Sequence, residues 1–192
     1  PDHSDFDWEG DGDFSIHFWV KFTGTLPSGD PQVFIGRDDP SSSINWWIGR
    51  TQLGAISMYM RDDVGNNITV TSVGVHNTGS WVRVLAIKEG YDITLYANET
   101  SVSDDQTFSG DFVADGDAPI VFGDLRATND EFSFNGGLDE IAFFDRVLTA
   151  QEISDFYTNT KDFEIGYCND ANPAFISAPS TSGEVGKEYT YD

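Results

Sequence analysis

The chain has 192 residues, of which 39% are hydrophobic and 14% aromatic, so it holds enough apolar material for a folded core and is not a disordered chain. Its 33 Asp and Glu residues outnumber ten Lys and Arg, giving a net charge of −23. This surface repels phosphate backbones and anionic membranes, which excludes nucleic-acid binding as a main function. It favours cations, above all calcium, because hard cations bind carboxylate and carbonyl oxygens. No stretch approaches 18 apolar residues, so we expect no membrane-spanning segment and no membrane insertion.

The first predicted element is a strand over residues 14–22. Its apolar residues alternate with polar ones, which is the period of a strand with one face on a core. His17 falls on the other face, where we expect a surface histidine. Trp19 shares that outward face.

Ten further runs are rich in Val, Ile, Phe, Tyr and Trp and are bounded by Gly, Asn and Asp. Many short strands without helices between them predict an antiparallel β-sandwich. The runs cover residues 32–37, 44–50, 55–61, 67–73, 81–88, 91–98, 101–108, 118–123, 132–136 and 138–145.

One segment has helical character. Thr149-Ala150-Gln151-Glu152 forms a capping box, in which the Thr149 hydroxyl and the Glu152 carboxylate each bond the other's backbone N–H. Ile153, Phe156 and Tyr157 follow at helical spacing. The pattern predicts a short helix over residues 150–158.

After residue 161 the composition changes. Residues 162–173 have the character of a linker, and residues 174–192 contain two strand-like runs, too few to bury a core of their own. Cys168 is the single cysteine, which excludes an internal disulfide and a cysteine-based zinc site. The acidic balance and low cysteine content fit a secreted or surface protein, so we expect an extracellular location.

Two motifs resemble those of laminin-G-like, concanavalin-A-like domains. Residues 13–21, with Phe18-Trp19-Val20-Lys21, resemble the opening strand of that family. Residues 134–153, with Gly137-Leu138-Asp139-Glu140 running into the helix, resemble its closing strand. Residues 81–84 and 91–98 resemble its central hairpin. The resemblance implies an all-β, antiparallel jelly-roll β-sandwich (concanavalin-A-like) with one short C-terminal helix over residues 1–161, beginning just after the strand with which the family pattern usually starts. Residues 174–192 resemble the start of an Ig-like or cadherin-like module.

The resemblance also implies a structural calcium ion. The family's closing-strand Asp, here Asp139, often binds calcium together with backbone carbonyls. Asp13 and Asp11, in the acidic run before the first strand, would add ligands. The alternative is that Asp139 caps a turn at Gly136-Gly137.

Glycoside hydrolases of the laminarinase type share this architecture and need two nearby carboxylates on one face. Asp139 and Glu140 are adjacent, so strand alternation predicts that they point to opposite faces. Asp145 lies six residues from Asp139, about 20 Å along a strand. We therefore predict no enzymatic activity.

Aromatic residues offer a different chemistry. Trp46 and Trp47 are adjacent, so one faces the core and the other faces out, where an indole can stack on a sugar. Tyr59 and Arg61 are expected on a related outer face. Alternatively, these side chains pack under a long loop.

Acidic loops at the sandwich rim are the last candidates. In related domains such loops hold calcium that bridges to a sugar or a protein, and here they contain Asp38, Asp39 and Asp62. The alternative is that they are solvated surface.

The leading hypothesis is a non-catalytic recognition or adhesion module of a larger extracellular protein. It would bind a glycan or protein ligand on a cell surface or matrix, with calcium as a structural ion. A second hypothesis is a spacer or polymer subunit completed by strand donation from a neighbour. A third is a carbohydrate-active enzyme with an unfamiliar site.

Overall fold

A computed structural model describes residues 6, 8, 12–23, 30–38, 45–76, 79–104, 118–126 and 132–158. The predicted linker at 162–173, Cys168 and the predicted module at 174–192 lie outside the described residues and stay predictions. The described elements are β1 (Phe14–Phe22), β2 (Gln32–Asp38), β3 (Asn45–Arg50), β4 (Ile56–Arg61), β5 (Asn67–Thr71), β6 (Trp81–Glu89), β7 (Asp92–Ala97), β8 (Thr100–Asp104), β9 (Val121–Phe122), β10 (Gly136–Phe144) and α1 (Ala150–Thr158).

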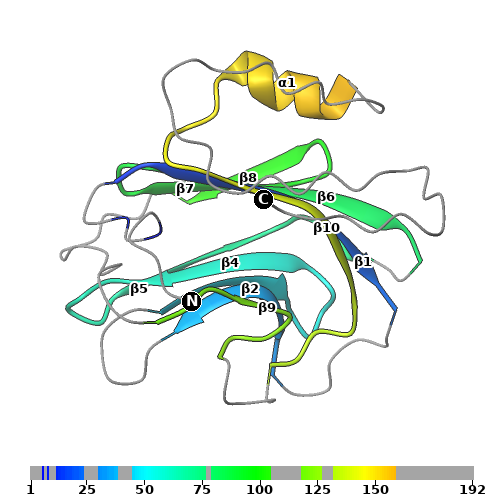
Figure 1. Ribbon diagram of the computed structural model, residues 1–192, viewed down its shortest axis with the longest axis horizontal. Coiled ribbons are helices and arrows are strands. Elements are labelled where there is room, and N and C mark those ends of the chain that lie inside the picture. Colours follow the sequence, from blue (N-terminus) through cyan, green and yellow to red (C-terminus); the bar gives the residue numbers. More distant parts are fainter. Residues whose placement is uncertain are drawn as a thin grey trace, which may run out of the picture.

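The strands form two antiparallel sheets packed face to face, as Figure 1 shows. One sheet has the order β10-β1-β6-β7-β8, and α1 lies over its outer face, so we call it the helix-side sheet. The other has the order β5-β4-β3-β2-β9, and we call it the far sheet. The predicted all-β sandwich with one short C-terminal helix is confirmed.

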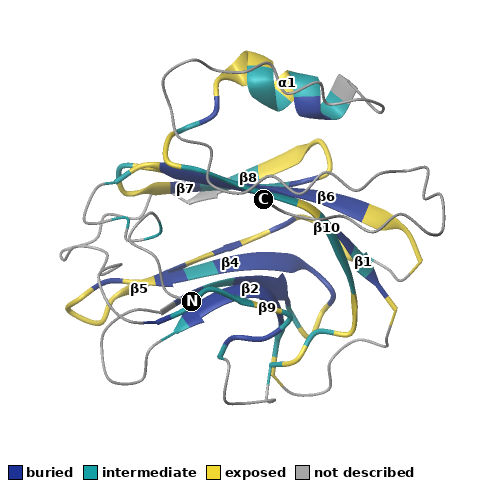
Figure 2. Ribbon diagram, in the orientation of Figure 1, coloured by how far each residue is buried: buried dark blue, intermediate teal, exposed yellow. Residues whose placement is uncertain are grey.

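The core fills the space between the sheets, where the buried faces of both meet (Figure 2). Strand alternation places Phe14, Ile16, Phe18, Val20 and Phe22 of β1 in this core, each at most 1% exposed. Alternation also governs β5, in which Ile68 and Val70 are buried between exposed neighbours.

The closing strand differs from the prediction. Residues 136–144 form the single strand β10, so there is no turn at Gly136-Gly137 and the two-strand prediction was wrong. Lys21 pairs with Gly137 and Phe22 with Gly136, and a Cβ at Gly136 would stand 2.2 Å from the Lys21 carbonyl oxygen. The glycines therefore let β10 lie close to β1 from its first residue.

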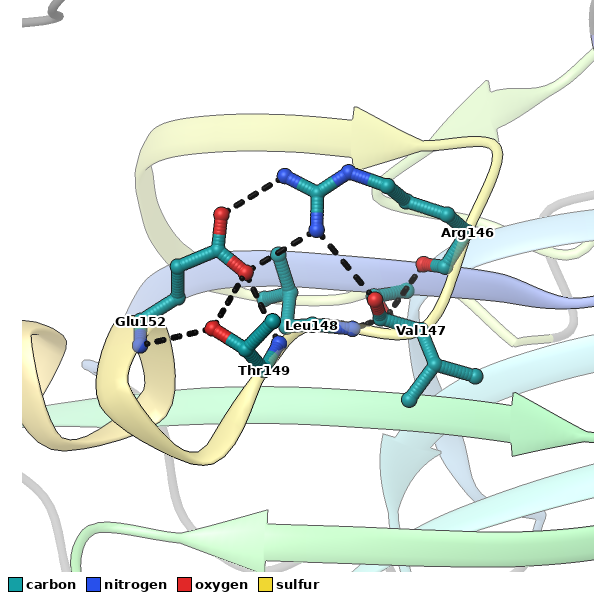
Figure 3. A network of polar contacts seen from close by, with 6 residues as sticks. Arg146, Val147, Leu148, Thr149 and Glu152 are labelled. Carbon is teal, nitrogen blue, oxygen red and sulfur yellow. Dashed lines mark hydrogen bonds and ion pairs between the residues drawn. The ribbon is translucent and has the colours of Figure 1, made fainter.

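The capping box of α1 is formed as predicted. The Thr149 backbone N–H donates to Glu152 Oε2 at 2.7 Å, and the Glu152 N–H donates to Thr149 Oγ1 at 3.3 Å (Figure 3). Arg146 donates to both Glu152 carboxylate oxygens, at 2.9 and 2.7 Å. The hydrogen bond from Arg146 is the main cause that lowers the pKa of Glu152 to about 2. The cap fixes where α1 begins.

The expectation of a surface histidine at position 17 was wrong. His17 is 3% exposed because α1 covers it, with its ring stacked on Phe156 at 4.3 Å and 17°. Phe156 also joins Leu85, Ile87 and Leu148 in a second hydrophobic cluster between α1 and the helix-side sheet. The outward face of β1 is therefore buried where α1 docks.

Candidate ligand-binding site

Two aromatic rings lie together on the outer face of the far sheet. Trp47 of β3 and Tyr59 of β4 are directly opposite across the strand pair. Their ring centroids are 5.7 Å apart and their planes differ by 10°. Fully superimposed rings would bring the centroids to about 3.5–4.0 Å. The rings are therefore offset, and part of each aromatic face is left uncovered by the other.

Strand alternation decides which tryptophan faces out. Trp46 is 3% exposed, belongs to the core and lies 6.0 Å from the Trp8 ring. The prediction that one of the two faces the core is confirmed, and Trp46 as a ligand-binding residue was wrong. Trp47 is the outward residue and is only half-buried.

Charged side chains stand beside the aromatic pair. Asp38 and Arg61 both act on the Tyr59 phenol, whose pKa is raised chiefly by partial burial; Asp38 reinforces the shift and Arg61 opposes it. Arg61 is exposed. Asp38 forms an ion pair with Arg126, and the Asp38 side chain is 3% exposed against 32% for Arg126. We call Asp38, Trp47, Tyr59, Arg61 and Arg126 the outer-face cluster.

A short segment after β9 positions Arg126. A Cβ at Gly36 of β2 would stand 2.9 Å from the Leu125 Cα, so this glycine lets residues 124–126 lie against the outer face of β2. Ser133 Oγ and the Leu125 N–H both donate to the Asp124 carboxylate, at 2.6 and 2.7 Å. The segment borders the outer-face cluster on the β2 side. The sequence does not point to Arg126, because its partner Asp38 is 88 residues away and no local pattern links them.

The structure does not bring the predicted acidic loop residues together at one site. Asp62 is fully buried and accepts hydrogen bonds from the Asn66 backbone N–H at 2.5 Å and the Asn66 side-chain amide at 2.7 Å. It holds the turn between β4 and β5, so its prediction as a ligand-binding residue was wrong. Asp39 lies outside the described residues. Asp38, which is the last residue of β2, is the predicted acidic residue that reaches the cluster.

The predicted calcium ligands are not brought together. Asp139 pairs with Trp19, whereas Asp13 precedes β1 by one residue, so the two stand about 20 Å apart along the strand pair. Asp13 Oδ1 accepts the Gly90 N–H at 2.8 Å, and Asp139 Oδ1 accepts the Glu140 N–H at 2.9 Å. Asp11 lies outside the described residues. Within the described ranges, no three His, Cys, Asp or Glu side chains are grouped as metal ligands.

Calcium binding thus stays a prediction that depends on Asp139 with carbonyl oxygens. Calcium at 100 times its dissociation constant should add about 2.7 kcal/mol to the free energy of unfolding. The thermal midpoint should rise by several degrees over that in chelator, and Asp139→Ala should remove the rise. An unchanged midpoint in the wild-type protein would exclude a stabilising calcium site.

A β-bulge changes the geometry of the two adjacent carboxylates. The β1–β10 register shifts between His17 and Trp19, and Glu140 has a φ of 50°. Glu140 Oε2 accepts the Trp19 indole N–H at 3.0 Å. The bulge therefore turns Glu140 toward the outer face of the helix-side sheet. Trp19 and its partner Asp139 lie on the same face. The prediction that Asp139 and Glu140 point to opposite faces was wrong, because it assumed a regular strand.

The sequence comparison fixes the family. Residues 2–154 match the Laminin_G_3 sequence model, which describes the concanavalin A-like lectin/glucanases superfamily. The chain belongs to this family. No curated protein sequence matches the chain. The family match covers the whole described sandwich and most of α1.

Solved structures share the fold at low identity. The carbohydrate-binding module CBM40 of Ruminococcus gnavus IT-sialidase is 16% identical with a TM-score of 0.59, over 76% of this chain and 83% of that one. The SAP-like pentraxin of Limulus polyphemus is 13% identical with a TM-score of 0.55, over 79% and 72%. Domains LG4-5 of the mouse laminin alpha1 chain are 18% identical with a TM-score of 0.52, over 74% and 41%. This chain spans less than half the length of the laminin pair.

In the described part of the chain, no helix has the length and hydropathy required to cross a membrane.

Proposed function

We propose that this domain is a non-catalytic recognition module of a larger extracellular protein, and that it binds a glycan on the outer face of the far sheet. The observation that carries the proposal is the offset, half-buried pair of Trp47 and Tyr59 beside the charged groups of Asp38, Arg61 and Arg126. An aromatic face packs on the apolar face of a sugar ring, and flanking polar groups bind its hydroxyls.

Three findings support a sugar ligand at this face. The helix α1 covers the other sheet, so it does not compete for this surface (Figure 1). The exposed residues Thr69 and Thr71 of β5 continue the outer face beside the rings, where they offer further donors and acceptors. The sialidase module with the same fold has been solved bound to alpha2,6 sialyllactose, which supports a sugar as the class of ligand.

The test is glycan binding by the wild-type protein and two tryptophan variants. Screening on a glycan array identifies a ligand, and titration then gives its affinity. Trp47→Ala should weaken binding about thirtyfold or more, since a central aromatic contact contributes about 2 kcal/mol. The matched control is Trp81→Ala, because Trp81 is 42% exposed on the other sheet and should leave affinity unchanged.

Equal effects of the two variants would refute the outer face as the binding surface. Absence of any glycan ligand would favour a protein ligand or a purely structural role. The adjacent carboxylates Asp139 and Glu140 make a direct assay for catalysis worthwhile. Release of reducing sugar from a bound glycan, lost in Glu140→Gln, would refute the non-catalytic part of the proposal.

A further inference from the structure

The strand β5 is an edge of the far sheet with an unusual composition. Residues 64–82 contain no Asp, Glu, Lys or Arg, although charged residues make up 22% of the chain. This uncharged run includes all of β5 and the loop that follows it. The strand is Asn-Ile-Thr-Val-Thr, whose β-branched residues favour pairing.

Comparison with the other three sheet edges shows what β5 lacks. Natural edge strands avoid pairing with other chains by being short, bulged or charged. The edge strand β9 has two residues, β10 is bulged and carries Asp139 and Glu140, and β8 ends in Asp104. The strand β5 has five residues, as β8 does, but it has neither a charged residue nor a register shift.

The hydrogen bonds of β5 in the described structure run to β4. The two strands pair from Ser57 with Thr71 to Arg61 with Asn67, and Ser57 Oγ donates to the Val70 carbonyl at 3.0 Å. In an edge strand, alternate residues direct their backbone N–H and C=O groups away from the sheet. The outward edge of β5 therefore offers donors and acceptors to an added strand.

Exposed valines precede and follow β5 in the sequence. Val64 is 62% exposed before the strand, and Val73 and Val75 are 70% and 55% exposed after it. In an antiparallel pair of two copies centred on Thr69, the turn that holds Val64 of one copy lies at the end of β5 that Val73 and Val75 follow in the other copy. Such a contact is self-complementary, as a twofold interface requires.

We propose that two copies of this chain pair antiparallel through β5, joining their five-stranded far sheets into one continuous sheet. The added strand is β5 of a second copy for two reasons. The valines at the two ends of β5 meet their counterparts in an antiparallel pair, and two uncharged edges pair without repulsion between charged side chains. The net charge of −23 on each copy opposes association. The dimer should therefore strengthen as salt screens this repulsion.

Cysteine cross-linking tests both the partner and the register. Thr69→Cys is made in a Cys168→Ser background, so that a single thiol is present. Residues opposite each other in an antiparallel pair have Cα atoms about 4.5–5.5 Å apart, which a disulfide spans. Mild oxidation should give a covalent dimer of this variant. The control Ser101→Cys, at an exposed position on the other edge strand β8, should stay monomeric.

Sedimentation velocity tests the interface without a cross-link. The wild-type dimer fraction should rise with protein concentration and with salt. Val73→Lys, alone and with Thr71→Lys, should keep the protein monomeric with its thermal midpoint unchanged, since Val73 is mostly exposed. A wild-type protein that stays monomeric at every concentration, a dimer that both variants retain, or open-ended assemblies would each overturn the proposal.

Discussion

Acidification from pH 6.5 to about pH 4 should lower the free energy of unfolding by about 3 kcal/mol through His17 alone. Burial under α1 is the main cause that lowers the pKa of His17, from 6.5 to about 3, and the positive charge of Arg83 acts in the same direction. The backbone of Glu140 opposes the shift. Since the folded-state pKa lies below the unfolded one, the stabilisation is complete above pH 6.5 and is lost as the pH falls toward 3.

The folded state disfavours the protonated, charged form of the His17 ring. His17 Nε2 is buried with no hydrogen-bond partner, and its ring lies flat on Phe156. Arg83 is 7% exposed and lies over the Trp19 ring at 4.4 Å and the Tyr157 ring at 5.4 Å. A charged His17 would add a second buried cation beside Arg83 beneath the helix.

The measurement is urea unfolding at a series of pH values for the wild-type protein and His17→Leu. Carboxylates titrate in both proteins, so the difference between the two curves isolates His17. The wild-type protein should lose about 3 kcal/mol more than the variant between pH 6.5 and 4. Parallel curves would show that His17 is accessible to protons in the folded state. His76→Gln is the matched control, with a smaller effect because His76 is only half-buried.

Predictions that depend on residues close together in the sequence were confirmed, and the prediction for His17, which depends on a distant residue, failed. The helix Ala150–Thr158 was predicted at its exact bounds, because its cap and its apolar spacing are local. The alternation of β1 likewise predicts its buried face. His17 was wrong because Phe156, which covers it, lies 139 residues further along the chain. No local pattern at His17 records that contact.

The candidate site was predictable only in part, for a related reason. Adjacent tryptophans on a regular strand face opposite ways, so the sequence predicts one outward ring. Which ring faces out depends on the register of β3 with β2 and β4, which pairs Trp46 with Arg37 and Trp47 with Tyr59. A β-bulge is harder still to predict from the sequence. The bulge at Glu140 shifts the alternation of β10, but the composition of the strand does not indicate it.

A second β-bulge, in β2, underlies the largest loss of unfolding free energy that we expect from a core substitution. Phe34 and Ile35 are consecutive and both belong to the core between the sheets, which strict alternation forbids, and the β2–β3 register shifts between Val33 and Ile35. The bulge turns Phe34 into the core. There its ring lies 5.6 Å from Phe22 and 4.9 Å from Phe134.

Phe34→Ala should therefore cost about 4 kcal/mol of unfolding free energy, from lost burial and from the cavity left among rigid rings. Phe34→Leu should cost less, because it refills most of that volume. The control is Phe122→Ala on the edge strand β9, where the ring is 52% exposed and its loss should change stability by less than about 1 kcal/mol. Urea unfolding measures all three. A similar cost for Phe34→Ala and Phe122→Ala would mean that the bulge does not hold Phe34 in a packed aromatic cluster, and that β2 adapts its register when the side chain is removed.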